Sequence, residues 1–416
     1  MSYGTVKLDP RENKVNNLND EMNNLTIVDL KVDYSDQDIA DCLKSALVDA
    51  SVSKDALMNE YAPYLGVPRF NSAIARFYSK LTNRTLDPKS EVLVTVGASE
   101  ALFATFSALS SPGDEWILIE PFYAKYEPQI KIAGAIPRFT ALKPANSNEN
   151  GNANNWVLDR NEIRNFINNN TQGIVFNNPN NPLGKSFTDN ELKFIAELAI
   201  SHKLWIISDQ AHEFTLDTMT PIASMPGMFE RTITIGTASK SFGVPSWRIG
   251  WAYGPAEVIR RLTYVQAQII RSPSTPPQLA LAVALEDEIC NFNSSDTYLA
   301  RARAHIKRKR AIMIEACREA GMLPVEPRGG SCLIVSWPGL SGIDLSPVSG
   351  RDRGEKFTNW MLENVGINSV SFNIFYGENH KPLGDDYLRF CYNKNDETLR
   401  LAAKNLLLLK EYVNNS

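Results

Sequence analysis

The stretch Thr232-Ile233-Thr234-Ile235-Gly236-Thr237-Ala238-Ser239-Lys240-Ser241-Phe242 decides the fold. Its first four residues are all β-branched, which predicts a short buried strand. Polar residues and a lysine follow that strand directly. Ligands of sheets that are covered by helices bind beyond the carboxyl ends of the strands. This stretch therefore predicts both a strand of such a sheet and a ligand-binding segment at its end.

Upstream of this stretch the chain alternates between short apolar runs and helical patterns. We expect strands at 92–96, 116–119, 173–176 and 204–208, and helices at 98–109, 126–133 and 189–202. Residues 249–252 predict a further strand. Buried strands that alternate with helices indicate an α/β fold with a mostly parallel sheet between two helical layers.

The length of 416 residues predicts two domains, because single cores rarely grow this large. After residue 274 the pattern is helical to 321, and a smaller α+β region follows from 324. We assign 1–50 to an N-terminal arm and part of the small domain, 51–305 to the large domain and 306–416 to the C-terminal small domain. The Asn-rich stretches 13–24 and 146–155 read as a loose arm and a surface insertion.

The net charge of −4 argues against nucleic acid as the main partner, because such proteins need a basic face. The basic run 307–310 lies in a helical stretch and reads as a solvated helix face. No apolar run reaches the roughly 18 residues of a membrane span. We therefore expect small-molecule substrates, with no nucleic acid and no membrane partner.

The five cysteines are odd in number and form no CxxC pair. This pattern disfavours a disulfide framework and a zinc site, so no metal is expected, and it suits a reducing compartment. The polar N-terminus has no apolar core of a signal peptide. A soluble, cytoplasmic protein follows from these features.

Four segments carry the chemistry, each at the end of a predicted strand: 97–100 (GASE), 177–184 (NNPNNPLG), 206–212 (IISDQAH) and 236–251 (GTASKSFGVPSWRIGW). Lys240 forms an imine with an aldehyde once its ammonium is desolvated. Asp209 closes a buried strand, where a carboxylate is costly unless a cation faces it. Arg248 and the helix start at 97–100 predict a phosphate site. These are the groups that pyridoxal phosphate (PLP) requires.

Together with 59–62 (NEYA), 120–123 (EPFY) and 387–391 (YLRFC), these segments resemble the class I aminotransferase family of PLP fold type I. The resemblance runs from about residue 59 to the C-terminus. It is greatest to the branch of kynurenine aminotransferase, glutamine transaminase K and cysteine-conjugate β-lyase. It implies a large domain with a mostly parallel seven-stranded sheet between helices, plus a smaller α+β domain.

The resemblance assigns roles by position. It makes Lys240 the Schiff-base lysine and proton shuttle, pairs Asp209 with the pyridine nitrogen, and gives Arg389 the substrate α-carboxylate. The remaining cofactor contacts fall to Asn181 at the phenolic oxygen, Tyr123 over the ring with Phe122 as its alternative, and Gly97, Ala98, Ser99, Thr237 and Arg248 at the phosphate. Tyr61 would reach over from a second subunit of a homodimer.

Three positions depart from the family pattern and leave alternatives open. His212 stands where relatives carry a tyrosine, and either replaces its hydrogen bond or serves as a second acid/base. Asp33 either meets a basic substrate side chain or is an exposed charge on a mobile arm. Arg271 either alters side-chain selection in the neighbouring subunit's site or forms a salt bridge at the rim. Asn181, Asp33 and Arg271 are thus candidate substrate contacts beside Arg389.

The resemblance implies an aminotransferase that converts a free L-amino acid into a 2-oxo acid. The departures at His212 and Asp33 motivate an alternative, a lyase, replacement enzyme or cyclase that uses the same Lys240. A regulator that uses the scaffold to bind an effector is disfavoured, because the chain shows no helix-turn-helix pattern and retains both Lys240 and Arg389.

Overall fold

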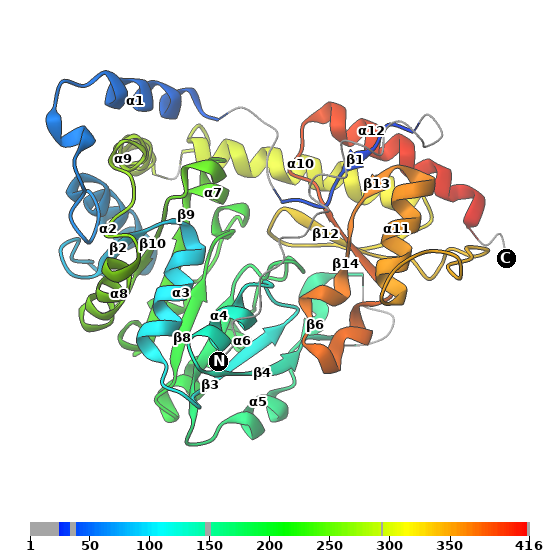
Figure 1. Cartoon of the computed structure of the whole chain (residues 1–416), viewed down its shortest axis with the longest axis horizontal. Coiled ribbons are helices and arrows are strands. Elements are labelled where there is room, and N and C mark those ends of the chain that lie inside the picture. The colour runs from blue at the N-terminus through cyan, green and yellow to red at the C-terminus, as the bar shows by residue number, and fades with distance from the viewer. Residues whose placement is uncertain (1–24, 34–38, 146–150, 293, 414–416) are drawn as a thin grey trace, which may run out of the picture.

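The computed structural model describes residues 25–33, 39–145, 151–292 and 294–413 (Figure 1). The expected arm 13–24 lies outside these residues, as does the first half, 146–150, of the Asn/Gly stretch 146–155. None of the helices in this part of the chain is long and apolar enough to cross a membrane.

A seven-stranded sheet forms the large part of the molecule, as predicted. Its order is β2 (Val92–Thr95), β10 (Gly250–Tyr253), β9 (Thr232–Thr237), β8 (Trp205–Asp209), β7 (Thr171–Asn177), β3 (Glu115–Glu120) and β4 (Ile136–Ala141). All neighbours are parallel except β10, which is antiparallel to both β2 and β9. The sequence pattern indicated the strand β10 but not its direction, and it did not indicate the edge strand β4.

Helices cover both faces because alternate strand residues point to opposite sides of the sheet. In β3, Trp116 and Leu118 pack in one core with α3 (Gly97–Leu109), α4 (Tyr126–Ile132) and α8 (Ala256–Ile269). Ile117 and Ile119 pack on the other face, which α5 (Arg160–Phe166) and α6 (Asp189–Ser201) cover. Helices α2 (Pro68–Thr82) and α9 (Thr275–Cys290) continue that second layer over β2 and β10.

A second, smaller sheet is antiparallel and has the order β11 (Leu323–Val325), β12 (Cys332–Ser336), β15 (Tyr387–Cys391) and β14 (Val370–Ser371). It shares a core with α10 (Tyr298–Glu319), α11 (Arg353–Val365) and α12 (Asp396–Leu406). The domain boundary expected between residues 305 and 306 falls inside α10, one continuous helix. The short strands β5 (Lys143–Pro144) and β6 (Trp156–Val157) pair separately.

The N-terminal segment joins both parts of the molecule. Strand β1 (Val28–Asp29) pairs in parallel with β13 (Ile367–Asn368) beside the small sheet. The Leu30 carbonyl then accepts a hydrogen bond from the Cys391 amide at 2.8 Å. Helix α1 (Asp41–Val52) lies back on the large part, against α9 (Figure 1). Residues 30–33 are thereby held where the two sheets face each other.

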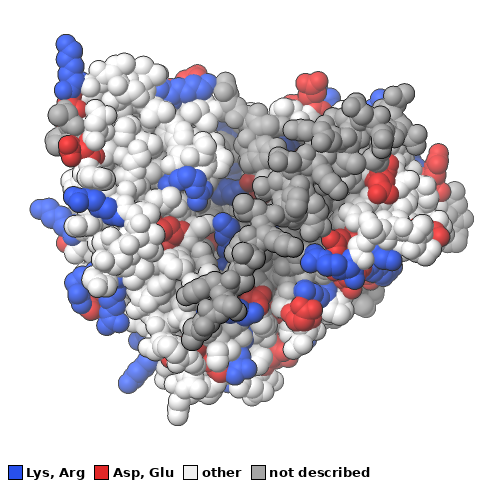
Figure 2. Space-filling view, viewed as in Figure 1, with Lys and Arg blue, Asp and Glu red and all other residues white. Residues whose placement is uncertain are grey.

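Charged side chains of both signs are interspersed on the molecular face in Figure 2. On the described surface of this face, Lys and Arg form no extended basic patch. This distribution agrees with the small net charge of the chain.

Candidate active site

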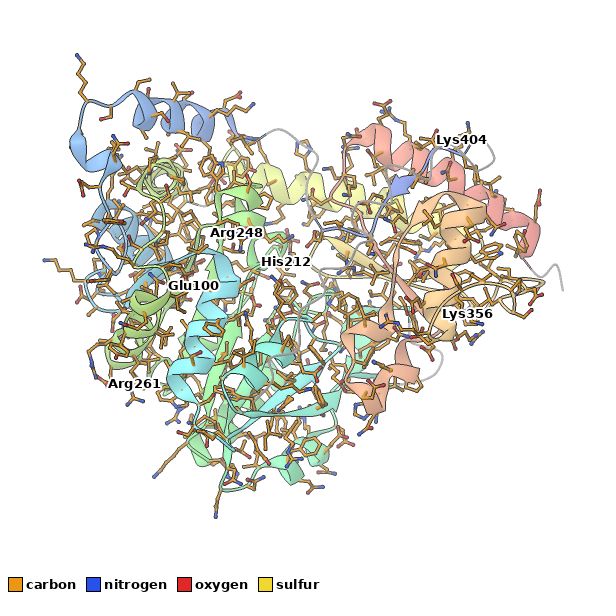
Figure 3. The ribbon with its side chains drawn as sticks, viewed as in Figure 1. Glu100, His212, Arg248, Arg261, Lys356 and Lys404 are labelled. Carbon is orange, nitrogen blue, oxygen red and sulfur yellow. The ribbon has the colours of Figure 1, made fainter. Side chains whose placement is uncertain are left out.

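A cavity of about 490 Å³ lies where the carboxyl ends of the large sheet face the small sheet. This volume falls in the range of small-molecule sites, roughly 300–1,000 Å³. Eleven predicted site residues line it: Asp33, Ala98, Ser99, Tyr123, Asn181, Asp209, His212, Thr237, Lys240, Arg248 and Arg389. Figure 3 places His212 and Arg248 near the middle of the molecule.

Strand register aligns the polar residues of the large sheet. Asn177 ends β7 opposite Asp209 at the end of β8, and Asp209 lies opposite Ile235 in β9. The Asn177 amide donates to the Asp209 carbonyl at 3.0 Å and its oxygen accepts from the Asn181 backbone at 2.6 Å. The Asn/Pro turn that carries Asn181 is therefore fixed to the strand that carries Asp209.

The Asp209 carboxylate is buried and faces the cavity without a cation. Its oxygens accept hydrogen bonds from the Tyr126 hydroxyl at 2.6 Å and the Ala211 amide at 3.0 Å. Burial raises the pKa of Asp209, although both hydrogen bonds oppose that shift. Among the described residues no ion pair includes Asp209. A cationic ring nitrogen would supply the charge that this carboxylate lacks.

Tyr126 is a contact that the sequence reading missed. It lies at the start of α4, and its ring packs edge-on against Tyr123 with 5.6 Å between centroids. The only signal was its spacing of three residues from Tyr123, which places both rings on one side of a helical turn.

The start of α3 forms an anion cradle with Arg248. Gly97 adopts φ +72, and a Cβ there would lie 2.6 Å from Nη2 of Arg248, so only glycine lets the guanidinium approach. The backbone amides of Ala98 and Ser99 belong to the first turn, where helix N–H groups lack intrahelical partners. Thr237 caps the short helix α7 (Ala238–Ser241) on the same side. This donor set fits a phosphate group.

Lys240 lies on α7 and pairs with Asp33. The distance from Lys240 Nζ to Asp33 Oδ2 is 2.7 Å, and the ammonium also donates to the Asp33 carbonyl. Burial lowers the pKa of Lys240, but the Asp33 charge outweighs it and the net shift is upward. Burial alone would raise the pKa of Asp33, yet Lys240 and His212 hold it below its usual range.

His212 is buried directly behind this ion pair. Its Nε2 lies 3.7 Å from Asp33 Oδ2. Burial lowers the pKa of His212 to about 4, with only partial opposition from the Asp33 charge. The imidazole is therefore neutral at pH 7, and the titration near neutrality expected from its usual pKa does not apply in this environment.

Arg389 enters the cavity from β15. Its Nη2 donates to the Lys31 carbonyl at 2.5 Å, and its guanidinium carbon lies 4.9 Å from the Phe375 ring centroid. The Nε donor is buried and has no hydrogen-bond partner within the described chain. A guanidinium with a free donor at a cavity wall is suited to bind a carboxylate.

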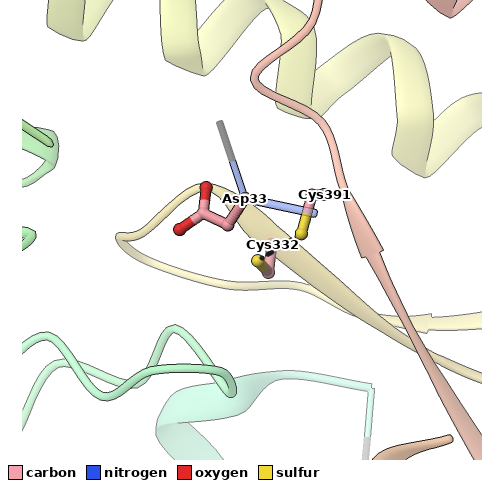
Figure 4. A group of neighbouring side chains, drawn as sticks. All are labelled: Asp33, Cys332 and Cys391. Carbon is pink, nitrogen blue, oxygen red and sulfur yellow. Dashed lines mark hydrogen bonds between the residues drawn. The ribbon is translucent and has the colours of Figure 1, made fainter. Parts of the chain in front are cut away.

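Cys332 and Cys391 lie next to Asp33, opposite each other on β12 and β15 (Figure 4). Their sulfur atoms are 3.1 Å apart and both thiols are free. Ligand atoms of these three residues lie within 4.8 Å of one another, a grouping that could hold a metal ion. Both carboxylate oxygens of Asp33 already have partners. Oδ2 pairs with Lys240, and Oδ1 accepts a hydrogen bond from the Ser331 hydroxyl at 2.5 Å.

Two predicted residues lie away from the cavity, next to each other. Tyr61 is 72% exposed, and the Arg271 guanidinium stacks 4.5 Å from its ring centroid. Arg271 also lies 5.5 Å from the Tyr64 ring centroid, and no salt bridge of Arg271 occurs among the described residues. Phe122, the alternative to Tyr123, is buried against Phe139 and does not line the cavity.

The comparison with known proteins agrees with this site. A family model described as aminotransferase class I and II matches residues 21–406. The chain belongs to this aminotransferase family. The aminotransferase is 35% identical to human kynurenine–oxoglutarate transaminase 1 over 86% of each chain. It is 36% identical to mouse kynurenine–oxoglutarate transaminase 3 over 88% of this chain and 82% of the relative.

Solved structures support the same assignment of the fold. N-Succinyldiaminopimelate aminotransferase from Mycobacterium tuberculosis superposes with a TM-score of 0.81 at 30% identity, covering 92% of this chain and 93% of that one. Escherichia coli YbdL, whose structure identified a methionine aminotransferase function, gives 0.81 at 26% identity and 92% coverage of both chains. The aminotransferase therefore has the type I fold and acts on an amino acid.

Proposed function

We propose that this aminotransferase binds pyridoxal phosphate through Lys240 and converts a free L-amino acid into its 2-oxo acid. Asp209 carries the proposal, because it is a buried carboxylate without a cation in the cavity that also contains Lys240. A pyridine nitrogen in its protonated form supplies that cation. When bound, the cofactor supplies the electron sink for removal of the substrate's α-proton.

Different residues of the cavity would bind different parts of the cofactor. Asp209, supported by the Tyr126 hydroxyl, would hold the ring nitrogen. The amides at Ala98 and Ser99, the Thr237 hydroxyl and the Arg248 guanidinium would hold the phosphate. Tyr123 would cover one face of the ring, and the fixed Asn181 amide would face the phenolic oxygen.

The remaining residues act on the substrate. Arg389 would orient its carboxylate, and Lys240 would carry the proton of the α-carbon. His212, neutral at pH 7, would offer a hydrogen bond in place of a tyrosine hydroxyl. The names of the curated relatives support kynurenine as donor and oxoglutarate as acceptor.

The assembly and the compartment are proposals of the same kind. The exposed Tyr61, stacked on Arg271, supports a homodimer in which this surface completes the partner's site. The five free cysteines support a reducing compartment such as the cytoplasm. The proposed domains are residues 1–50, 51–305 and 306–416.

One observation supports the alternative of a lyase or cyclase. Two of the three residues that depart from the family pattern, Asp33 and His212, lie 3.7 Å apart beside Lys240. Their combined acid/base capacity would suit the additional proton transfers of a lyase or cyclase. Product analysis separates the alternatives, because a lyase or cyclase releases ammonia or a cyclised product without consuming a 2-oxo acid.

The test is an ultraviolet–visible titration of the purified protein with aromatic, glutamine, sulfur-containing and basic amino acids, without a 2-oxo acid. The lysine-bound cofactor should give a band near the violet edge. Stoichiometric loss of this band with release of a 2-oxo acid identifies an aminotransferase and its donor. Absence of the band from the purified, cofactor-supplemented protein would refute the proposal.

A further inference from the structure

Asp33 holds a negative charge at the atom that reacts. Its carboxylate is 13% exposed and its Oδ2 lies 2.7 Å from Lys240 Nζ. The Ser331 hydroxyl occupies the other oxygen, Oδ1. The oxygen directed at the reacting nitrogen is therefore the one without a neutral hydrogen-bond partner.

Formation of the bond between Lys240 and the cofactor replaces the ammonium that balances this charge by an imine nitrogen, which is a cation only while it carries a proton. Among the described residues, the titratable groups facing Asp33 are Lys240 from α7, His212 after β8, Cys332 on β12, Arg389 and Cys391 on β15, and Tyr392 directly after β15. His212 is neutral at pH 7, and Arg389 donates to the Lys31 carbonyl without forming an ion pair with Asp33 in the described chain. Whenever the bonded nitrogen is unprotonated, Asp33 thus lacks a full cation partner, and a buried unpaired carboxylate is costly.

We propose that Asp33 is a further catalytic residue, whose Oδ2 binds the substrate's α-ammonium and accepts one proton from it. The step is R–NH₃⁺ plus Asp33–COO⁻ giving R–NH₂ plus Asp33–COOH. No electrons are transferred, and the amine gains the lone pair that it needs to displace Lys240. The inference rests on the proposed function, because it assigns the proton acceptor for the entry of the substrate.

The geometry favours the α-ammonium over a basic side chain. Asp33 contacts Nζ itself, so its carboxylate lies at the nitrogen that the substrate replaces. Arg389 donates to Lys31, two residues before Asp33, so the site for the α-carboxylate adjoins the carboxylate of Asp33. The α-ammonium and α-carboxylate are attached to one carbon, so two neighbouring groups of opposite charge match them. The sequence-based expectation of a basic side chain is replaced by recognition of a group that every α-amino acid carries.

The test uses the cofactor-loaded enzyme and the variants Asp33→Asn and Asp33→Glu. The pH midpoint of the cofactor band reports the proton on the nitrogen next to Asp33. An opposite charge at this distance shifts a pKa by about 1–3 units. We expect Asp33→Asn to lower the midpoint by at least about one unit, with partial restoration in Asp33→Glu. Asp41→Asn, at an exposed position on α1, is the matched control.

The pH profile of kcat/KM gives a second readout. Asp33→Asn should lose most activity at pH 7, where the substrate is an ammonium ion. The deficit should shrink as pH rises and the free amine becomes the major form. A purely structural role would lower kcat/KM by a similar factor at every pH.

A band midpoint that is unchanged in Asp33→Asn, together with a constant deficit across pH, overturns the inference. Ser331→Ala keeps it testable if Asp33→Asn does not fold, because loss of the hydrogen bond to Oδ1 should raise the band midpoint slightly. No change in that variant would likewise count against the role. A wild-type enzyme without any cofactor band would instead refute the proposed function, and this inference with it.

Discussion

The two walls of the active site are built in different ways. The wall from the large sheet consists of adjacent strand ends, with Asn177, Asp209 and Thr237 closing β7, β8 and β9. The wall from the small sheet brings the segment 31–33 next to Ser331, which is 298 residues from Asp33, and Arg389, which is 358 residues from Lys31. The first wall holds groups suited to the cofactor, and we call it the cofactor wall. The second holds groups suited to the substrate, and we call it the substrate wall. Damage to the first should abolish chemistry, whereas damage to the second should mainly change substrate binding and its pH dependence.

The largest effect is expected at Lys240. Lys240→Ala removes both the cofactor bond and the proton carrier, so activity should fall by at least about 10³-fold. The cofactor band near the violet edge should disappear in the same variant. Lys193→Ala, at an exposed position on α6, should leave both unchanged. Substantial activity in Lys240→Ala would remove the basis of the comparison between the walls.

Arg389→Lys tests the substrate wall. A lysine keeps the charge but loses the two parallel donors, which should cost roughly 1.5–3 kcal/mol of binding, about 10–100-fold in KM. Steady-state kinetics should show a much smaller change in kcat, with cofactor affinity unchanged. Arg318→Lys, which alters a surface pair with Glu326, is the control. A loss confined to kcat would show that the two walls do not divide the work as described.

Tyr126→Phe tests the cofactor wall more gently. It removes one of two hydrogen bonds to the Asp209 carboxylate, worth about 0.5–1.5 kcal/mol. We expect weaker cofactor binding and a kcat lower by about 3–10-fold, with KM nearly constant. Fluorescence titration of the apoenzyme with cofactor provides the measurement, and Tyr264→Phe on exposed α8 is the control. Unaltered cofactor affinity would show that Asp209 does not depend on Tyr126.

Glu213→Gln should have the smallest effect on activity. Glu213 is buried behind the cofactor wall, and its substitution should change the free energy of unfolding. Burial raises the pKa of Glu213 to about 8, with Tyr78 donating a hydrogen bond that opposes the shift. The folded state therefore keeps a proton that the unfolded chain loses near pH 4.5. The free energy of unfolding should fall as pH rises from about 4.5 to about 8. Glu213→Gln should lose this slope.

Thermal unfolding at pH 6 and pH 9 checks this prediction. The gain in Tm of the variant relative to the wild type should be larger by a few degrees at pH 9 than at pH 6. Parallel Tm curves for both proteins across this range would show that Glu213 is not protonated in the folded state.

The contrast between the walls also explains how far the sequence could predict the site. Asp209, Thr237 and Lys240 follow β-branched runs, so their position at strand ends could be inferred locally. The contact between Asp33 and Lys240 spans 207 residues and depends on the pairing of β1 with β13, two strands of two residues each. No periodic pattern identifies such short strands. The alternative that left Asp33 as an exposed charge was therefore reasonable from sequence and wrong in the fold.

Other differences have equally local causes. The direction of β10 depends on the connection from β9, and a buried strand of either direction has the same apolar composition. The expected pKa of His212 came from the free side chain, whereas complete burial sets the value in the fold. Tyr126 was missed because its hydroxyl reaches Asp209 across 83 residues of sequence.

The pairing of β1 with β13 places Asp33 and Arg389 in the same structural unit, so they move together. Ser331, Arg389 and residues 28–33 are all fastened to the small sheet, whereas Lys240 belongs to the large one. Any rotation of the small sheet away from the large sheet would withdraw the ammonium-binding and carboxylate-binding groups together and break the Asp33–Lys240 pair in the same movement. A substrate that contacts both groups would stabilise the arrangement in which the two sheets lie close together. A molecule with only one of the two charges would stabilise it less.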